Sequence, residues 1–410
     1  MKTVEREKIG TTADVVSTAM RAGIAILALL AAAKLGDEFH RLVWGLPENL
    51  GAVDLVRRWN ETRAWFAGEP VYALDDAIYP PATYPVLWPI LGWIDFEGAR
   101  RLWAVVYVVF LAWLVAITLR ESGVRSRAGR VAAAFVPLAM NATGATIGNG
   151  QLLLLVLPPL VASCLLAARG GAGGREDLRT DLSIAALFSI AMAKPSASAP
   201  FAWIILFCPG RLRPAVLTGA AYLLLTAFAL AFQPIDTGSI GGSDPAGSAR
   251  RIIGASYGNL QAWLVHRGLE ASPLMVVLPA VVLLATGLWV WKRRATDPWN
   301  LIGVVAIVAR TGWYHRMYDD LLILLPVIAL LRIGTRRAHG EDDLRRAPAI
   351  LVAIASIAAG LVPARLHTRG YPVTSLVVNT ATVATWLAAF VLLDREAKRT
   401  SSGTVNPPPR

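Results

Sequence analysis

The feature that most restricts the fold of this chain is a series of long apolar segments, separated by short clusters of Arg and Lys. A helix of about 20 predominantly apolar residues is long enough to cross the hydrocarbon core of a bilayer. Hydrophobic residues make up 55% of the 410 positions and charged residues only 17%, whereas a soluble domain has about 25% charged residues. The sequence therefore predicts an all-α polytopic membrane protein, and it argues against a disordered chain, a disulfide scaffold and an ordinary soluble enzyme.

The positions of the basic residues indicate topology rather than a ligand. The formal net charge of +12 could suggest nucleic acid as a partner, but Arg and Lys gather in short loops between apolar segments. Cytoplasmic loops of membrane proteins carry such an excess of positive charge. We therefore expect no nucleic-acid partner, and we expect a multi-pass protein of the cell membrane with both termini in the cytoplasm.

About twelve transmembrane helices are expected. The apolar block 182–208 contains Lys194 followed by Pro195, and two half-helices that meet there preserve the alternation of the basic loops. Residues 79–94 could form another span, but we prefer an interfacial helix, because a span would place the next basic cluster outside. Besides the two half-helices, the expected spans are 14–35, 100–119, 131–147, 152–168, 214–232, 273–291, 300–312, 321–331, 348–363 and 372–393.

This topology divides the chain into four parts. We expect a cytoplasmic N-terminus at 1–13, a catalytic transmembrane module at 14–347, C-terminal transmembrane helices at 348–393 and a cytoplasmic tail at 394–410. The catalytic module includes the long outer loop 36–99, with interfacial helices in it. The sequence contains no recognisable internal repeat, which disfavours a secondary transporter, since sites of transporters often lie between repeats.

The first outer loop contains a candidate general base. Asp54, Arg57, Arg58, Glu61 and Trp65 follow a roughly helical spacing, which predicts an amphipathic helix beside the membrane. In one interpretation, all of these charges are solvated on an interfacial helix. In the other, one carboxylate acts as a general base where a lipid-borne substrate meets its acceptor.

Other basic residues could bind an anion. Lys194 lies within an apolar segment, where a charge is costly unless it serves a function. Its side chain could extend to the outer interface, or it could bind a phosphate. Arg310 and His315 could contribute to the same anion site, as could Arg250 and Arg251, although this last pair could equally be surface residues.

No cofactor motif accompanies these residues. The chain has no His, Cys or carboxylate spacing typical of a metal site, no phosphate-binding P-loop and no dinucleotide-binding motif. We therefore expect neither a metal nor a cofactor. A transferase with this sequence would need a donor that reaches it through the bilayer.

Six short motifs occur in the order found in a known family. They are VDLVRRW, FAGEPVY, IYPPATYP, GNGQLLLL, AMAKPSASAP and RTGWYHRMYDD. On these motifs the chain resembles the integral-membrane glycosyltransferases of the C-type superfamily, and specifically glycosyltransferase family 87. That group includes polyprenyl-phosphate-mannose-dependent α-1,2-mannosyltransferases and related arabinofuranosyltransferases.

The resemblance implies roles for individual residues. Asp54 matches the catalytic aspartate, which would deprotonate the acceptor hydroxyl. Lys194, Arg310 and His315 match positions that hold the phosphate or sugar of the donor. Further residues are expected to line the lipid groove, namely Tyr79, Tyr84, Asn149, Gln151, Trp313 and Tyr314.

The resemblance also implies the reaction. An inverting glycosyltransferase would move a sugar, mannose before arabinofuranose, from a polyprenyl-phosphate donor to a glycolipid or cell-envelope glycan. The reaction would take place in the membrane, on its extracytoplasmic side. A lipid-linked-sugar flippase or transporter is the main alternative, and a polymerase or ligase of the O-antigen type is another. The candidate residues lie mostly at the outer ends of the spans, which favours the enzyme.

Overall fold

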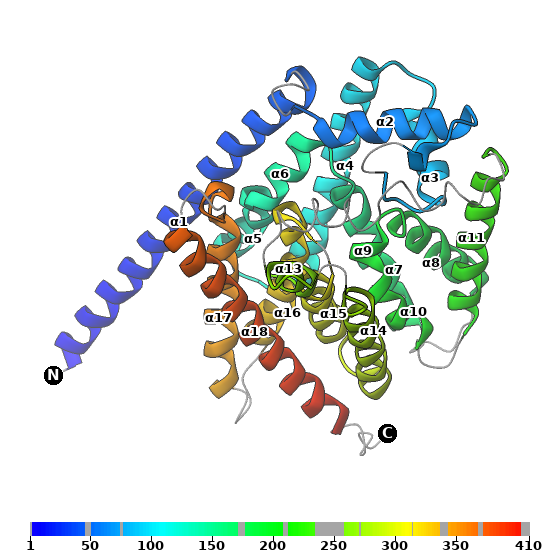
Figure 1. Ribbon diagram of the computed structural model, residues 1–410. Coiled ribbons are helices and arrows are strands. Elements are labelled where there is room, and N and C mark those ends of the chain that lie inside the picture. The colour runs from blue at the N-terminus through cyan, green and yellow to red at the C-terminus, as the bar shows by residue number, and fades with distance from the viewer. Residues whose placement is uncertain are drawn as a thin grey trace.

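The structure is a computed structural model, and all its regular elements are helices. It describes residues 2–45, 51–73, 77–170, 177–207, 212–233, 258–269, 272–313, 315–336, 343–367 and 372–402. In these residues there is no strand (Figure 1). The all-α prediction is thus confirmed for the described part of the chain.

The helices follow one another with short connections. In the first half they are α1 (Lys2–Trp44), α2 (Val53–Phe66), η2 (Val71–Ala73), α3 (Thr83–Leu91), α4 (Phe96–Glu121), α5 (Arg127–Ala139), α6 (Asn141–Asn149), α7 (Leu153–Gly170) and α8 (Leu178–Ala191). In the second half they are α9 (Pro195–Ser198), η4 (Ala199–Phe201), α10 (Ala202–Leu206), α11 (Arg213–Leu230), α13 (Leu260–His266), α14 (Leu274–Arg293), α15 (Pro298–Gly312), η6 (Met317–Ile323), α16 (Leu324–Thr335), α17 (Asp343–Leu361), η8 (Ala364–His367) and α18 (Pro372–Ser402).

Fewer helices than twelve qualify as complete spans. In the described residues, five helices are long and apolar enough to cross a membrane: residues 18–44 of α1, α4, α11, α14 and residues 374–401 of α18. The pair α5 and α6, bent by 43°, would be a sixth. Most of the other expected spans form shorter helices. The 15-residue α15 and the 12-residue α16 are mostly buried in the protein. The structure thus agrees with a polytopic membrane protein, while the number twelve is not confirmed.

Two predicted details of the chain path are confirmed. The helix α3 has nine residues, too few to cross a bilayer, so residues 79–94 do not form a complete span. The apolar block around Lys194 is broken, because α8 ends at Ala191 and α9 begins with Pro195. Pro195 occupies the first turn of α9, where a proline gives up no helical hydrogen bond.

The predicted end of the first span was too early. Residue 35 was expected to end it, but α1 continues to Trp44 because its polar side chains have partners on α6. The Nζ of Lys34 donates a hydrogen bond to the Oδ1 of Asn141, and the Nη2 of Arg41 donates to the Oδ1 of Asn149 at 2.6 Å. These bonds compensate the cost of burying polar groups beside apolar helices.

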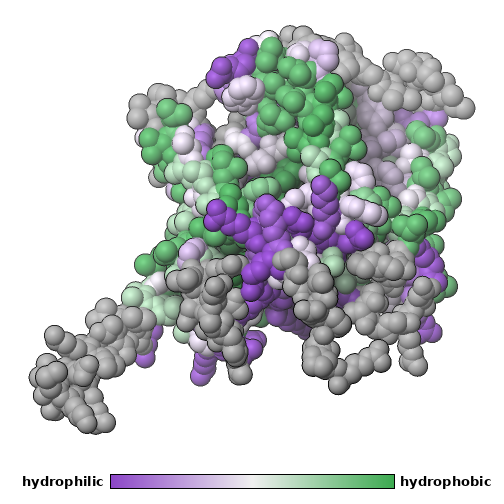
Figure 2. Space-filling view, turned by 90° about the horizontal axis from the view of Figure 1, so that it is seen from below, coloured by the Kyte–Doolittle hydropathy of each residue, from purple (hydrophilic) through white to green (hydrophobic). Residues whose placement is uncertain are grey.

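A cluster of ion pairs joins the helix ends at one side of the bundle. The carboxylate of Glu121, the last residue of α4, accepts hydrogen bonds from Arg169 on α7 and from the indole Nε1 of Trp299 on α15, the latter at 2.8 Å. Arg332 on α16 lies 3.5 Å from the same carboxylate and 3.2 Å from that of Asp297. From below, Figure 2 shows hydrophilic side chains gathered across the molecule, with hydrophobic surface beside them.

Removing the central carboxylate of this cluster should destabilise the fold. We expect Glu121→Ala to lower the free energy of unfolding by about 1–3 kcal/mol, because it removes hydrogen bonds between charged groups. Thermal unfolding of the detergent-solubilised protein would measure the change. Glu97→Ala is the matched control, since Glu97 is exposed and its pair with Arg100 lies within one helix. Equal melting temperatures for the two variants would show that the cluster does not hold the helices together.

Candidate active site

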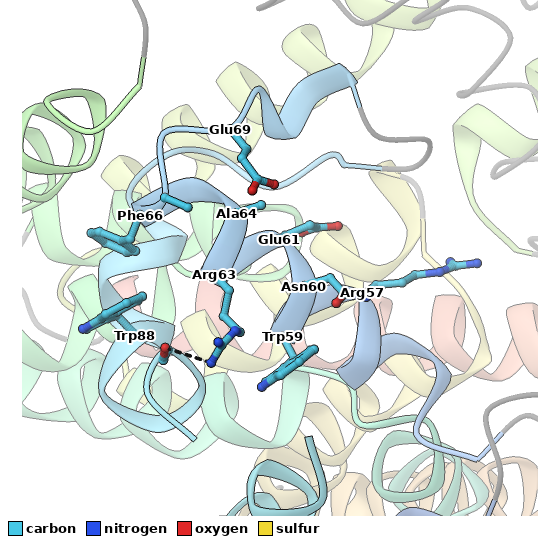
Figure 3. A pocket seen from close by; sticks show the side chains of 11 residues that line it. Arg57, Trp59, Asn60, Glu61, Arg63, Ala64, Phe66, Glu69 and Trp88 are labelled. Atoms are coloured by element: carbon cyan, nitrogen blue, oxygen red, sulfur yellow. Dashed lines mark hydrogen bonds between the residues drawn. The ribbon is translucent and has the colours of Figure 1, made fainter. Parts of the chain in front are cut away.

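Two cavities adjoin α2, and they share the side chain of Arg57. The first, which we call the Asp54 pocket, has a volume of about 160 Å³. It is lined by Asp54, Arg57, Arg58, Ile78, Tyr79, Pro80, Gly150, Gln151, Leu152, Lys194, Pro195, Ser196, Arg316, Tyr318 and Asp319. The second, the α2–α3 groove, is larger and lies between α2 and α3 (Figure 3). The Asp54 pocket unites five segments of the chain, residues 54–58, 78–80, 150–152, 194–196 and 316–319.

The turn between α6 and α7 places Asp54 in this pocket. The backbone N–H of Ala52 donates to the carbonyl of Gly148 at 2.9 Å, so α2 begins directly on the turn. Gly150 has a φ of +73°, and a Cβ there would lie 2.4 Å from the Cβ of Leu55, so only glycine fits. Asp54 follows in the first turn of α2, where the helix dipole favours a negative charge.

The side chain of Asp54 is accessible and only loosely held. It is 17% exposed, and its Oδ1 lies 3.9 Å from the Nη1 of Arg57. At that distance the carboxylate retains lone pairs for a substrate hydroxyl, which a general base needs.

Another wall of the pocket is built on a buried ion pair. The Nζ of Lys194, at the break between α8 and α9, donates to the Oδ1 of Asp319 in η6. The same Nζ lies 4.8 Å from the ring centre of Tyr318. The Nδ1 of His315 lies 3.1 Å from the other oxygen of Asp319. Burial alone would raise the pKa of Asp319, but the ammonium of Lys194 and the contact with His315 outweigh it and hold this pKa below its usual range.

Arg58 contributes a cation that the sequence had not identified as a site residue. Its Nη2 pairs with Glu61, while its Nε and Nη1 are buried without a hydrogen-bond partner in the described residues. The guanidinium lies 4.3 Å from the ring centre of Tyr79. A buried guanidinium with unused donors is costly, and an anionic ligand would satisfy it.

The lining of the pocket is cationic overall. Among the described residues, four basic side chains line it, Arg57, Arg58, Lys194 and Arg316, against the two carboxylates Asp54 and Asp319. A cavity with this excess of positive charge attracts and holds anions.

The structure brings together four of the predicted site residues. Asp54, Tyr79, Gln151 and Lys194 all line the Asp54 pocket. His315 lies behind this wall, where it contacts the Asp319 carboxylate.

Other predicted site residues lie elsewhere. Arg310 is buried and pairs with Asp320, with Trp386 against its guanidinium, because α15 turns this side chain into the bundle. Asn149 accepts a hydrogen bond from α1, as described above. Tyr84 stacks on Trp65 with ring centres 4.4 Å apart.

Neither Tyr84 nor Asn149 lines either cavity in the described part of the chain, and the same holds for Trp313, which follows the end of α15. The predicted residues Tyr314, Arg250 and Arg251 lie outside the described residues.

The sequence missed Arg58, Arg316 and Asp319 as residues of the pocket. A signal existed for Arg58, which follows Asp54 by four residues and so shares its helix face. Asp319 and Arg316 belong to the RTGWYHRMYDD motif, but nothing in that motif indicated that Asp319 pairs with Lys194.

Glu61 should make the stability of the fold depend on pH. Burial raises the pKa of Glu61 from 4.5 to about 7, even though the neighbouring Arg58 acts in the opposite direction. The folded state therefore binds this proton more tightly than the unfolded state. The resulting stabilisation is complete below about pH 4.5 and is lost as the pH rises toward about 7.

We expect the free energy of unfolding to fall by up to about 1.4 kcal/mol per pH unit in this window. Glu61→Gln should flatten that fall, and thermal unfolding between about pH 5 and about pH 8 would measure it. Glu97→Gln should keep the wild-type profile. If the stability of Glu61→Gln depended on pH in the same way as that of the wild type, Glu61 would not be the group responsible for the fall.

A comparison with known proteins identifies the family. The model of glycosyltransferase family 87 matches residues 77–313, more than half of the chain. The match includes Lys194, Tyr79 and Gln151, and it begins after Asp54. No curated protein and no solved structure matches the chain. The chain therefore belongs to glycosyltransferase family 87.

Proposed function

We propose that this glycosyltransferase transfers a sugar from a polyprenyl-phosphate donor to a glycolipid or cell-envelope glycan, with inversion at the anomeric carbon. The observation that carries this proposal is the Asp54 pocket, in which an accessible carboxylate faces a group of cations. A glycosyl transfer to a hydroxyl needs a base for the acceptor and cations for a phosphate leaving group.

The proposed reaction assigns each partner of this geometry a step. The carboxylate of Asp54 accepts the proton of the acceptor hydroxyl while that oxygen attacks the anomeric carbon. The bond between this carbon and the phosphate oxygen breaks, and polyprenyl phosphate leaves from the opposite face with the bonding electrons. One new glycosidic bond replaces one glycosyl-phosphate bond, and the configuration is inverted.

Arg58 and Lys194 would stabilise the leaving phosphate in different ways. The charge of Lys194 is already balanced by Asp319, so its ammonium positions the phosphate rather than adding net charge. Arg58 has two buried donor groups to spare, and its partner Glu61 is partly protonated near neutral pH because its pKa is about 7. A preorganised cation of this kind stabilises the charge that develops in the transition state.

Sequence features support a lipid-linked donor and an extracytoplasmic site. A donor carried on a lipid brings its own leaving group and needs no nucleotide-binding domain, and the chain has no motif for one. We propose mannose before arabinofuranose, because the resemblance includes mannosyltransferases. With the basic loops in the cytoplasm, the pocket opens on the extracytoplasmic side of the cell membrane. The reaction as written requires no resident metal or cofactor.

Replacing the proposed base should slow transfer by orders of magnitude. We expect Asp54→Asn to lower the rate of transfer about 10²- to 10⁴-fold, because a positioned general base contributes an acceleration of this size. Purified protein in detergent, radiolabelled polyprenyl-phosphate mannose and a glycolipid acceptor would provide the assay. Glu97→Gln is the control for a lost carboxylate. An active Asp54→Asn enzyme would refute the role of Asp54, and wild-type protein without transfer would favour the flippase.

The buried ion pair allows a structural role of Lys194 to be separated from a functional one. Lys194→Met alone should destabilise the fold by about 3–5 kcal/mol, because it leaves the Asp319 carboxylate buried without its cation. The double variant Lys194→Met/Asp319→Leu should recover most of this stability and still show a raised KM for the donor. Melting temperature and donor KM are the two measurements. A double variant with the wild-type donor KM would show that Lys194 has a structural role only.

A further inference from the structure

The α2–α3 groove is a second cavity, to which the proposed reaction assigns no ligand. It has a volume of about 860 Å³, within the size range of ligand sites. Its lining residues are Arg57, Trp59, Asn60, Glu61, Arg63, Ala64, Phe66, Ala67, Glu69, Trp88 and Gly92. Most of these side chains come from α2, and Trp88 faces them from α3 (Figure 3).

One wall of the groove is aromatic. The Trp88 indole is 36% exposed and lies over Gly92, where an added Cβ would come within 2.1 Å of the ring. The ring of Phe66 lies 4.5 Å from Trp88 and 4.8 Å from Phe232, next to α11. The helix α11 has exposed apolar side chains, including that of Phe228 at 6.2 Å from Phe66. Aromatic contacts thus connect the groove to the exposed apolar surface of α11.

The other side of the groove is polar. Asn60 and Glu69 are exposed there and offer amide and carboxylate groups. Arg63 donates to the carbonyl oxygens of Gly92 and Ile94, at 3.4 and 3.3 Å, and this fixes its guanidinium at the edge of the groove (Figure 3). Amides and carboxylates are the groups that hydrogen-bond sugar hydroxyls, while the flat face of a sugar ring packs on an indole.

The groove adjoins the Asp54 pocket along α2. Arg57 lines both cavities, and it follows Asp54 by three residues, about 4.5 Å along a helix axis. The lining positions from Arg57 to Ala67 then extend the groove by about 15 Å, enough for more than one sugar ring.

From these observations we infer that the α2–α3 groove binds an amphipathic glycolipid acceptor, with its sugar headgroup on Trp88 and its hydrocarbon along Phe66 and α11. The terminal hydroxyl of the headgroup would reach Asp54 past Arg57. This inference rests on the proposed function, because it assigns the acceptor of that reaction.

Binding without turnover tests the groove. The probe is n-octyl α-D-mannopyranoside, added to Asp54→Asn protein in nanodiscs and followed by saturation-transfer NMR. We expect contact signals from the sugar protons, and we expect them to be lost in Trp88→Ala and in Gly92→Ala, whose Cβ displaces the indole. The matched control is Trp93→Ala, because this indole is 66% exposed and does not line the groove.

Steady-state kinetics provides the second readout. In the otherwise wild-type enzyme, Trp88→Ala should raise the KM for the acceptor about tenfold, as the loss of a central aromatic anchor does, and leave the donor KM unchanged. Trp93→Ala should change neither constant.

The two proposals fail in different ways. Equal sugar signals from Trp88→Ala and Trp93→Ala would contradict the proposal that the groove binds the acceptor. The proposal would also be contradicted if 1-octanol bound with the same affinity as the mannoside and displaced it. If wild-type protein binds the mannoside in the groove but transfers no sugar, the groove remains a glycolipid site and the proposed reaction is refuted.

Discussion

The candidate site depends on one buried ion pair, between Lys194 and Asp319. Neither charge would be stable alone in an apolar bundle, and each makes the other tolerable. Lys194 lies at the break between α8 and α9, and Asp319 lies in η6, so the pair ties the break to the segment after α15. The pocket wall is thereby held in a fixed shape in a part of the chain that lacks regular helix.

The same principle organises the rest of the bundle. Several polar groups on the long apolar helices meet a partner from another helix. Lys34 and Arg41 on α1 meet Asn141 and Asn149 on α6, and Glu121 collects hydrogen bonds from α7 and α15. Apolar contacts alone specify few positions of one helix against another in a lipid environment, so these polar contacts define how the helices align.

The short helix α2 connects the two cavities. Its first turn carries Asp54 into the reaction pocket, its middle carries the Arg58–Glu61 pair, and its second half forms one side of the groove. The Arg58–Glu61 pair lies on the buried face of α2, so this short helix packs against the protein through charged as well as apolar side chains. A donor arriving from one side and an acceptor arriving from the other would meet at its N-terminus.

The sequence by itself determined the local features of this protein. Apolar segments predicted the helices, Pro195 predicted the break beside Lys194, and the ordered motifs indicated the family. These signals reside in neighbouring residues, so they can be read along the chain.

Only the tertiary structure decided which charges meet. Lys194 and Asp319 are 125 residues apart, and no local pattern distinguishes Asp319 from Asp320, which pairs with Arg310 away from the pocket. Long-range pairing depends on how each helix is rotated about its axis when it packs. Successive residues of a helix point about 100° apart, so neighbouring side chains can face a cavity and the core, respectively.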